Sequence, residues 1–341
     1  MTVDHDISVK IKNMGFACAC LVVSIHVGLT GDKFTLPWIF KEFIAEGIAR
    51  IAVPFFFCVA GYFVARKYTD SPNKVMTWRV EIQKRIKTLA VPYWIWNLLY
   101  APLLIGLAIV SDIAAGRVIR HIDWLSVVLR CSGLDLVNSP LLYPLWFIRN
   151  LLVLILVSPA ILAVAEKFPK FMIVFVYVAH IVFELFGIEL PSIISLQGLV
   201  YFMSGLVLGA GGIRVAPWLR SRLMGFVLLA IGVAELLLSK ILELPSSSLT
   251  IIIPFLLAGM WCLMSVSRWD HRLVSLAFPI YLMHPFVLLA LQYLWHLTAH
   301  LPTALVFLFR WIMAIFISCI FAWLLKKQCP NFARVAFGGR L

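Results

Sequence analysis

The chain contains long apolar runs, each about as long as a membrane-spanning helix, separated by short polar segments. A helix needs about 20 mostly apolar residues to cross the hydrocarbon core of a bilayer. Because 62% of the residues are hydrophobic and only 13% are charged, a water-soluble domain does not account for the composition. The runs are continuous, unlike the alternating pattern of a transmembrane barrel. The sequence therefore predicts an all-α, polytopic membrane protein.

We expect about ten transmembrane helices that together form one membrane-embedded domain over residues 1–341. The expected spans are residues 13–30, 44–65, 88–111, 141–164, 171–188, 193–212, 223–242, 249–267, 275–297 and 304–325. No soluble domain or low-complexity linker separates them. The first run lacks a small-x-small cleavage site before the next polar stretch, so we interpret it as an uncleaved span.

The basic residues predict the orientation of the chain in the membrane. The net charge is +13, but the basic residues lie between the apolar runs, which is typical of orienting charges and not of nucleic-acid binding. With a cytoplasmic N-terminus, 20 of the 29 Lys and Arg residues fall in cytoplasmic segments. We therefore expect both termini in the cytoplasm, membrane lipids as partners, and no nucleic acid.

Two of the longer connecting segments have features of their own. The cytoplasmic segment 66–87 is strongly basic, and its residues 78–87 predict a helix at the membrane interface. That helix is either a positive-inside anchor or part of a site for a phosphate-rich cytosolic donor. The outer segment 112–140 is expected to lie along the surface as an amphipathic segment or to cover a substrate entrance.

The sharpest candidate for chemistry is His26. Two lysines, Lys10 and Lys12, lead into an apolar run that ends at this histidine, and an ionisable group inside a membrane is a candidate for function because it is costly to bury. An unperturbed imidazole titrates near neutrality, which suits a general base that takes a proton from a hydroxyl. The alternative is a structural histidine.

Three further intramembrane side chains are candidates. Arg50 lies near the start of its span, where it serves function or extends to the outer interface. Arg149 lies deeper and needs a partner such as an anionic substrate, a carboxylate or backbone carbonyls. His284, followed by Pro285, is either functional or a buried neutral imidazole that donates to a carbonyl.

Other polar residues carry less information. His180 and Glu184 are spaced i,i+4, so we expect them to satisfy each other. No cluster of Cys, His or carboxylate residues has metal-ligand spacing, and no glycine-rich phosphate loop is present. We therefore expect no metal site.

Taken together, the pattern resembles the acyltransferase 3 family of bacterial membrane acyltransferases that O-acylate sugars and surface glycans. The resemblance covers nearly the whole chain, and is closest to members that acetylate enterobacterial surface polysaccharide. It rests on five features in order: His26 at the end of the first span, 50–62 (RIAVPFFFCVAGY), 85–96 (RIKTLAVPYWIW), 145–147 (LWF) and 280–284 (IYLMH).

The resemblance implies transfer of an acyl group, usually acetyl from acetyl-CoA on the cytosolic side, to a glycan hydroxyl in the bacterial inner membrane. His26 matches the catalytic position, and Arg50 and Arg85 match positions where the family usually has arginine. On this basis the expected catalytic residues are His26, Arg50, Arg149 and His284, and the expected donor-binding residues are Lys12 and Arg85. The glycan or its lipid-linked precursor is the expected acceptor.

The sequence departs from the family at Gly15, where an arginine eleven residues before the histidine is common. Lys12 lies fourteen residues before His26, about 21 Å along a helix, and is the residue expected to compensate. Ala60 and Gly61 stand where the family often has Ser-Gly. Two other hypotheses stay open: a transporter or flippase for a glycan or anionic substrate, and a catalytically inactive paralogue.

Overall fold

The protein was analysed as a computed structural model that describes residues 5–29, 31–119, 121–188, 190–211, 221–245, 248–294 and 301–340. Over these residues it is built from helices and contains no β-strand, so the predicted all-α class is confirmed. Residue 212, most of the predicted loop 213–222, and the end of the predicted span 275–297 lie outside the described residues.

Each predicted span overlaps one longer α-helix. These helices are α1 (His5–Ile25), α3 (Ala52–Thr69), α5 (Val91–Ala114), α7 (Trp146–Lys167), α8 (Pro169–Leu185), α9 (Leu196–Gly209), α10 (Arg222–Ile241), α11 (Leu249–Leu263), α13 (Ala277–Tyr293) and α14 (Thr303–Gln328). Shorter helices connect them: α2 (Leu36–Ile39), α4 (Lys74–Arg85), α6 (Trp124–Ser132), α12 (His271–Ser275) and α15 (Pro330–Ala336), the π-helices η1 (Phe40–Ala45) and η3 (Ile86–Ala90), and the 3₁₀-helices η2 (Ile48–Ile51) and η4 (Tyr143–Leu145).

Six helical stretches in the described part of the chain are long and apolar enough to cross a membrane. They are His5–Ile25, Leu36–Thr69, Lys74–Ala114, Tyr143–Lys167, Arg222–Ile241 and Thr303–Gln328. The helices α9, α11 and α13 are apolar but shorter. The chain is therefore a multi-pass membrane protein with fewer full-length spans among its described residues than the ten expected.

The shorter length of α11 has a physical reason. The predicted span runs to residue 267, but the helix ends at Leu263. The Asn13 side chain of α1 donates to the backbone carbonyls of Ser265 (3.2 Å) and Ser267 (2.9 Å), which holds this segment in a turn. An apolar run thus stops being helical where a buried amide from another helix takes its carbonyls.

Each of the two connecting segments singled out in the sequence contains a helix. The helix predicted over residues 78–87 is present in α4 and the start of η3, and it continues without a break into α5. In the outer segment, α6 begins at an Asp123 side chain that accepts from the Ser126 backbone N–H (3.2 Å). It ends at Gly133, which has the left-handed φ of 84° typical of helix C-termini.

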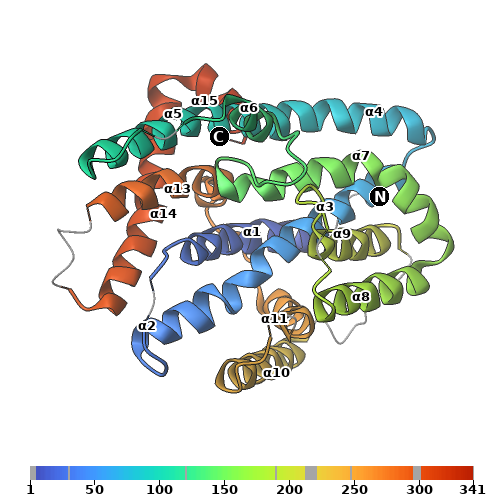
Figure 1. The fold of residues 1–341 in the computed structure, drawn as a ribbon. Coiled ribbons are helices and arrows are strands. Elements are labelled where there is room, and N and C mark those ends of the chain that lie inside the picture. Colours follow the sequence, from blue (N-terminus) through green and yellow to red (C-terminus); the bar gives the residue numbers. More distant parts are fainter. Residues whose placement is uncertain are drawn as a thin grey trace.

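Helix α1 lies in the interior of the helix assembly, between the α4–α5 line at one edge and the α10–α11 pair at the other (Figure 1). It contacts α3, α13 and α14, so elements from both halves of the chain surround it. Near its end, the Trp311 indole of α14 donates to the Cys20 carbonyl (2.8 Å). Together with the Asn13 contacts, this bond fixes α1 at two levels.

Helices α3 and α9 pack closely against each other through small residues. A Cβ atom on Gly61 would lie 2.1 Å from the Phe202 carbonyl oxygen, and one on Gly205 would lie 1.9 Å from the Cys58 carbonyl oxygen. Contacts this close are possible only for glycine. The pair α3–α9 therefore depends on both glycines.

We predict that Gly205→Ala lowers the free energy of unfolding by about 1–3 kcal/mol, because the new methyl group separates two packed backbones. The midpoint of thermal unfolding in one detergent measures this. Gly106→Ala in α5 is the matched control, because a Cβ there meets nothing within 4 Å. Equal midpoints for the two variants would contradict the predicted dependence.

Candidate active site

His26 lies in the last, tightened turn at the end of α1. Its backbone N–H donates to the Val23 carbonyl at 3.1 Å, an i to i−3 bond that closes the helix, and Gly28 then turns the chain with a φ of 71°. The side chain is half-buried. The imidazole is thus held by a helix end and is still accessible from one side.

The second histidine of the site, His284 of α13, lies against the first. The two imidazole ring centroids are 5.1 Å apart with an angle of 33° between the rings. His284 has no exposed surface, and its Nδ1 is 3.1 Å from the Ile280 carbonyl oxygen. The structure brings together two predicted site residues that are far apart in the sequence.

The Ile280 carbonyl decides which nitrogen of His284 carries the proton. A carbonyl oxygen only accepts, so in the neutral imidazole Nδ1 is the donor and Nε2 presents a lone pair. That Nε2 is buried and has no hydrogen-bond partner among the described residues. His284 therefore offers a buried acceptor at the site.

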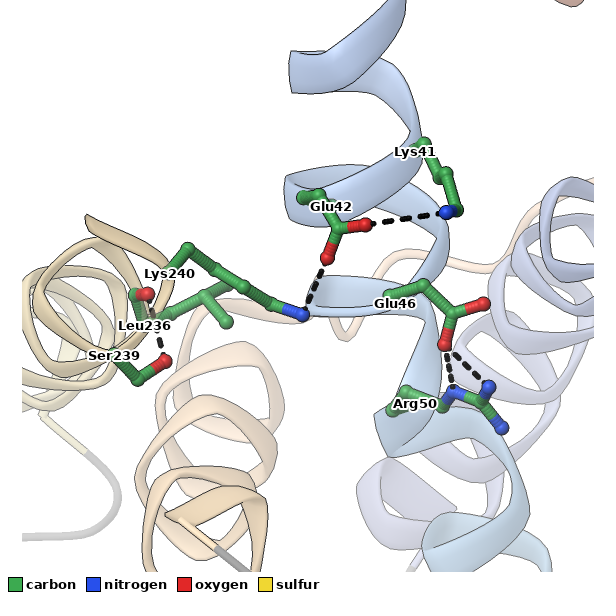
Figure 2. Close-up of polar contacts among 7 residues, drawn as sticks. All are labelled: Lys41, Glu42, Glu46, Arg50, Leu236, Ser239 and Lys240. Carbon is green, nitrogen blue, oxygen red and sulfur yellow. Dashed lines mark hydrogen bonds and ion pairs between the residues drawn. The ribbon is translucent and has the colours of Figure 1, made fainter. Parts of the chain in front are cut away.

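Arg50, also predicted as a site residue, lies beside the His26 end of α1. Its Nε donates to Glu46 Oε2 at 3.0 Å, and its Nη2 contacts the same oxygen (Figure 2). Both members of this pair lie within electrostatic range of the His26 imidazole. The Arg50 side chain is 43% exposed, so a ligand can reach it.

The segment that carries Arg50 is tied to a distant helix. In η1, the Glu42 carboxylate binds Lys240 of α10 at 2.7 Å and Lys41 at 3.4 Å (Figure 2). Glu42, Glu46 and Arg50 are spaced four residues apart, one helical turn each. The Lys240 contact therefore holds the start of the same segment that presents Arg50.

A cavity of about 610 Å³ opens beside the first half of α1, at Lys12, and we name it the cationic cavity. Its walls come from α1, α3, α4, η3, α7, α12, α13 and the segment after α15, with apolar and aromatic side chains on most sides. The cations and the main aromatic residues that line it are Lys12, Arg85, Arg340, Phe56, Phe147 and Tyr281. Both predicted donor-binding residues, Lys12 and Arg85, thus face one cavity.

Tyr281 connects the cationic cavity to the histidines. Tyr281 lines the cavity, and its ring centroid is 6.4 Å from that of His284. His284 lies about one turn after Tyr281 on α13. The Tyr281 hydroxyl donates to the Pro144 carbonyl, and its ring meets the edge of Phe147 at 6.0 Å. The two regions are therefore neighbours along one helix.

Arg149 lies elsewhere, and its guanidinium binds oxygens of the protein. Nη1 donates to the carbonyls of Asp135 (2.8 Å) and Asn138 (3.0 Å), and Nη2 donates to the Ser192 carbonyl (2.8 Å) and hydroxyl (2.9 Å). The sequence allowed an anionic substrate, a carboxylate or backbone carbonyls as the partner of Arg149, and the structure shows backbone carbonyls together with the Ser192 hydroxyl. This geometry fastens two loops to α7 and leaves the predicted catalytic role of Arg149 without a direct contact to the histidines in the described residues.

The expected pair of α8 is present, with His180 Nε2 at 3.6 Å from Glu184 Oε1. Among the described residues no group of three or more His, Cys, Asp or Glu side chains could hold a metal ion.

Sequence reasoning missed three residues of the site. Glu46 stands four residues before Arg50, a spacing that indicates an ion pair on one helix face. Tyr281 lies within a motif already singled out, three residues before His284. Arg340 carries no local signal, because only the path of the chain after α14 brings it to the cavity.

Comparison with known proteins identifies the family. A family model described as an acyltransferase domain matches residues 15–327, which is most of the chain. The chain belongs to this acyltransferase family.

A curated relative is similar at lower level. The succinoglycan biosynthesis protein ExoH of Rhizobium meliloti (strain 1021) is 25% identical over 183 residues, which cover 49% of this chain and 45% of that protein. The chain thus matches less than half the length of this relative. No solved structure matches the chain.

We predict that Arg149→Lys lowers the free energy of unfolding by roughly 2–4 kcal/mol, because an ammonium cannot serve the four oxygen acceptors that the guanidinium reaches. Thermal unfolding and protease cleavage within residues 133–140 measure the change, with the exposed Lys84→Ala as control. A stable Arg149→Lys protein that has lost acyl transfer would instead support the catalytic role predicted from the sequence.

Proposed function

We propose that the protein is an O-acyltransferase that moves an acyl group, most simply acetyl, from acyl-CoA to a hydroxyl of a cell-surface polysaccharide or its lipid-linked precursor. The observation that carries the proposal is the arrangement along α1. A contacting pair of histidines lies at the end of this helix, and a cavity with several cations lies beside its first half, at Lys12. Family membership supports acyl transfer as the reaction.

The donor is proposed to occupy the cationic cavity. Lys12 and Arg85 would bind its phosphates, for which cationic side chains are suited. Lys12 and His26 are separated by about 21 Å along the helix, a span comparable to an extended pantetheine arm. The apolar and aromatic walls suit that arm, so the thioester would approach the histidines past Tyr281.

A second cavity, of about 350 Å³, begins two residues beyond His26 and is our candidate for the acceptor. It is lined by Gly28, Leu29, Gln292 and Arg310. Amide and guanidinium groups are hydrogen-bond donors to sugar oxygens. The similarity to a succinoglycan biosynthesis protein supports a polysaccharide as the acceptor class.

In the proposed reaction His26 is the general base. It takes the proton of the acceptor hydroxyl as the oxygen attacks the thioester carbonyl carbon, forming the C–O bond of the new ester. The carbon–sulfur bond then breaks, and the leaving coenzyme A thiolate takes the proton from the protonated His26, which restores the base. Arg50 would stabilise the negative charge that develops on the carbonyl oxygen, and Glu46 would hold Arg50 in place.

His284 is proposed as the positioning residue for the base. Its Nε2 lone pair would accept the N–H of His26, which leaves the other nitrogen of His26 able to take the acceptor proton. The same lone pair cannot donate to an oxyanion. His284 would therefore act on the base and not on the negative charge of the carbonyl oxygen.

We further propose that residues 1–341 form one acyltransferase domain in the bacterial inner membrane with both termini in the cytoplasm. The distribution of Lys and Arg supports this orientation. The cationic cavity would then open toward the cytosolic acyl-CoA pool.

We predict that His26→Ala reduces acyl transfer by roughly a hundred- to ten-thousand-fold, the usual contribution of a positioned general base. Mass spectrometry of surface polysaccharide from deletion and His26→Ala strains, with purified protein in parallel, measures this. Full activity of His26→Ala would exclude His26 as the base. A transporter or flippase would move the glycan without changing its mass. An acyl group on polysaccharide from the wild-type strain that is missing from the deletion strain therefore distinguishes the acyltransferase from a transporter.

We predict that His284→Ala lowers kcat by about tenfold to a hundredfold and leaves the KM for acyl-CoA unchanged, because it disturbs the orientation of the base without touching the donor. The double variant with His26→Ala should be no slower than His26→Ala alone, since the positioning residue acts through the base. Independent losses that multiply would show that His284 has a separate role.

A further inference from the structure

The segment after α14 returns to the cationic cavity and places Arg340 in its wall. α15 packs beside α5, and the Trp96 indole of α5 donates to the Ala336 carbonyl at 2.9 Å. Phe337 has no exposed surface and stacks near Trp96 at 5.5 Å. This segment is therefore fastened to the helix assembly immediately before Arg340.

Two glycines make the turn that directs Arg340 inward. Gly338 and Gly339 have φ values of +60° and +73°, which side-chain-bearing residues rarely adopt. A Cβ atom on Gly338 would lie 2.3 Å from the Thr88 carbonyl oxygen, so the chain passes η3 at backbone contact. The turn therefore requires glycine at residue 338, and the positive φ favours it at residue 339.

The Arg340 guanidinium is held in place but retains donors for a ligand. Its Nη1 donates to the Thr88 carbonyl at 3.1 Å, and its central carbon lies 3.8 Å from the Phe278 ring centroid. A guanidinium has five N–H donors, and within the described residues the Arg340 guanidinium donates one hydrogen bond, to Thr88. Ring stacking orients its plane without using the remaining donors.

The charge around the cavity favours an anion. Lys12, Arg85 and Arg340 line it, and none of its described lining residues is a carboxylate. Arg85 binds Glu81 at 2.6 Å, but Glu81 also binds Lys67. Burial, and then the nearby Arg85, lower the pKa of Arg340 to about 10. An anionic ligand between these cations would relieve their repulsion.

We infer that Arg340 is a donor-binding residue that, with Arg85 and Lys12, binds phosphate oxygens of the nucleotide part of acyl-CoA. This inference rests on the proposed function for the identity of the ligand. The planar fork of a guanidinium matches two phosphate oxygens at once, which the Lys12 ammonium does not. The segment after the last long helix thus supplies a guanidinium to the cavity, whereas α1 supplies only the ammonium of Lys12.

Gly15 shows where α1 lacks that cation. A Cβ atom there would meet Phe56 at 3.8 Å and Phe55 at 3.9 Å, which are ordinary contacts, and Phe56 lines the cationic cavity. Gly15 is one turn from Lys12 on the same face of the helix. A side chain at this position would therefore start toward the cavity wall.

The test is the binding of coenzyme A and of pantetheine to the purified full chain in detergent, measured by isothermal titration calorimetry. We expect Arg340→Ala to weaken coenzyme A binding about tenfold or more, the usual effect of losing a charged hydrogen-bonding partner. Pantetheine lacks the nucleotide phosphates, so its affinity should be unchanged. Arg334→Ala, an exposed arginine of the same segment, is the charge-matched control and should bind both as the wild type does.

Two results would overturn the role of Arg340 while leaving the proposed donor intact. One is coenzyme A binding by Arg340→Ala at the wild-type affinity. The other is an equal loss of coenzyme A and pantetheine binding, which indicates a structural residue. Wild-type protein that binds neither compound would overturn the proposed donor itself and the inference with it.

A second variant tests the charge independently of the turn. Gly15→Arg added to Arg340→Ala should recover part of the coenzyme A affinity, because it returns a guanidinium to the cavity from α1. The claim is that coenzyme A binding needs the charge of Arg340 and not the packing of its side chain. A double variant that binds coenzyme A no more tightly than Arg340→Ala would overturn this claim.

Discussion

The cost of burying an ionisable group in a membrane protein is the constraint on which the rest of this structure depends. Such a group needs either partners within the protein or a cavity, and the candidate site residues of this protein differ in which of the two they have. Arg149 directs its donors to the oxygens of two loops. His26 and His284 instead face each other, with a lone pair left on the buried ring. The first arrangement stabilises a fold, and the second is suited to moving a proton.

Helix α1 fixes the distance between the proposed donor site and the proposed base. One rigid helix carries Lys12 at the cationic cavity and His26 at the histidine pair, so the distance between them is set by helical rise alone. Bonds from Asn13 and Trp311 fix the helix to its neighbours at two levels. A reaction that joins a long donor to a distant acceptor needs such a fixed spacing between binding and chemistry.

The helices and the ion pairs within a helix could be predicted from local sequence patterns, whereas the exact ends of the helices and the contacts between helices could not. The ten apolar runs each contain a helix, because helical hydrogen bonds are local and apolar length is visible in the sequence. The end of α11 could not be predicted, because it is set by the contacts of Asn13, on a distant helix, with Ser265 and Ser267. Ion pairs at i,i+4, such as His180–Glu184, follow directly from spacing.

The sequence by itself determined the membrane-embedded helical class, the family, and the candidate residues, because hydrophobic length and short motifs are properties of neighbouring residues. Only the tertiary structure decided which candidates meet. It joined His26 to His284, gave Arg149 to the loops, and brought Arg340 to the cavity of Lys12 and Arg85. These contacts connect residues far apart in the chain, and they depend on how helices pack and turns redirect the backbone, which no local pattern encodes.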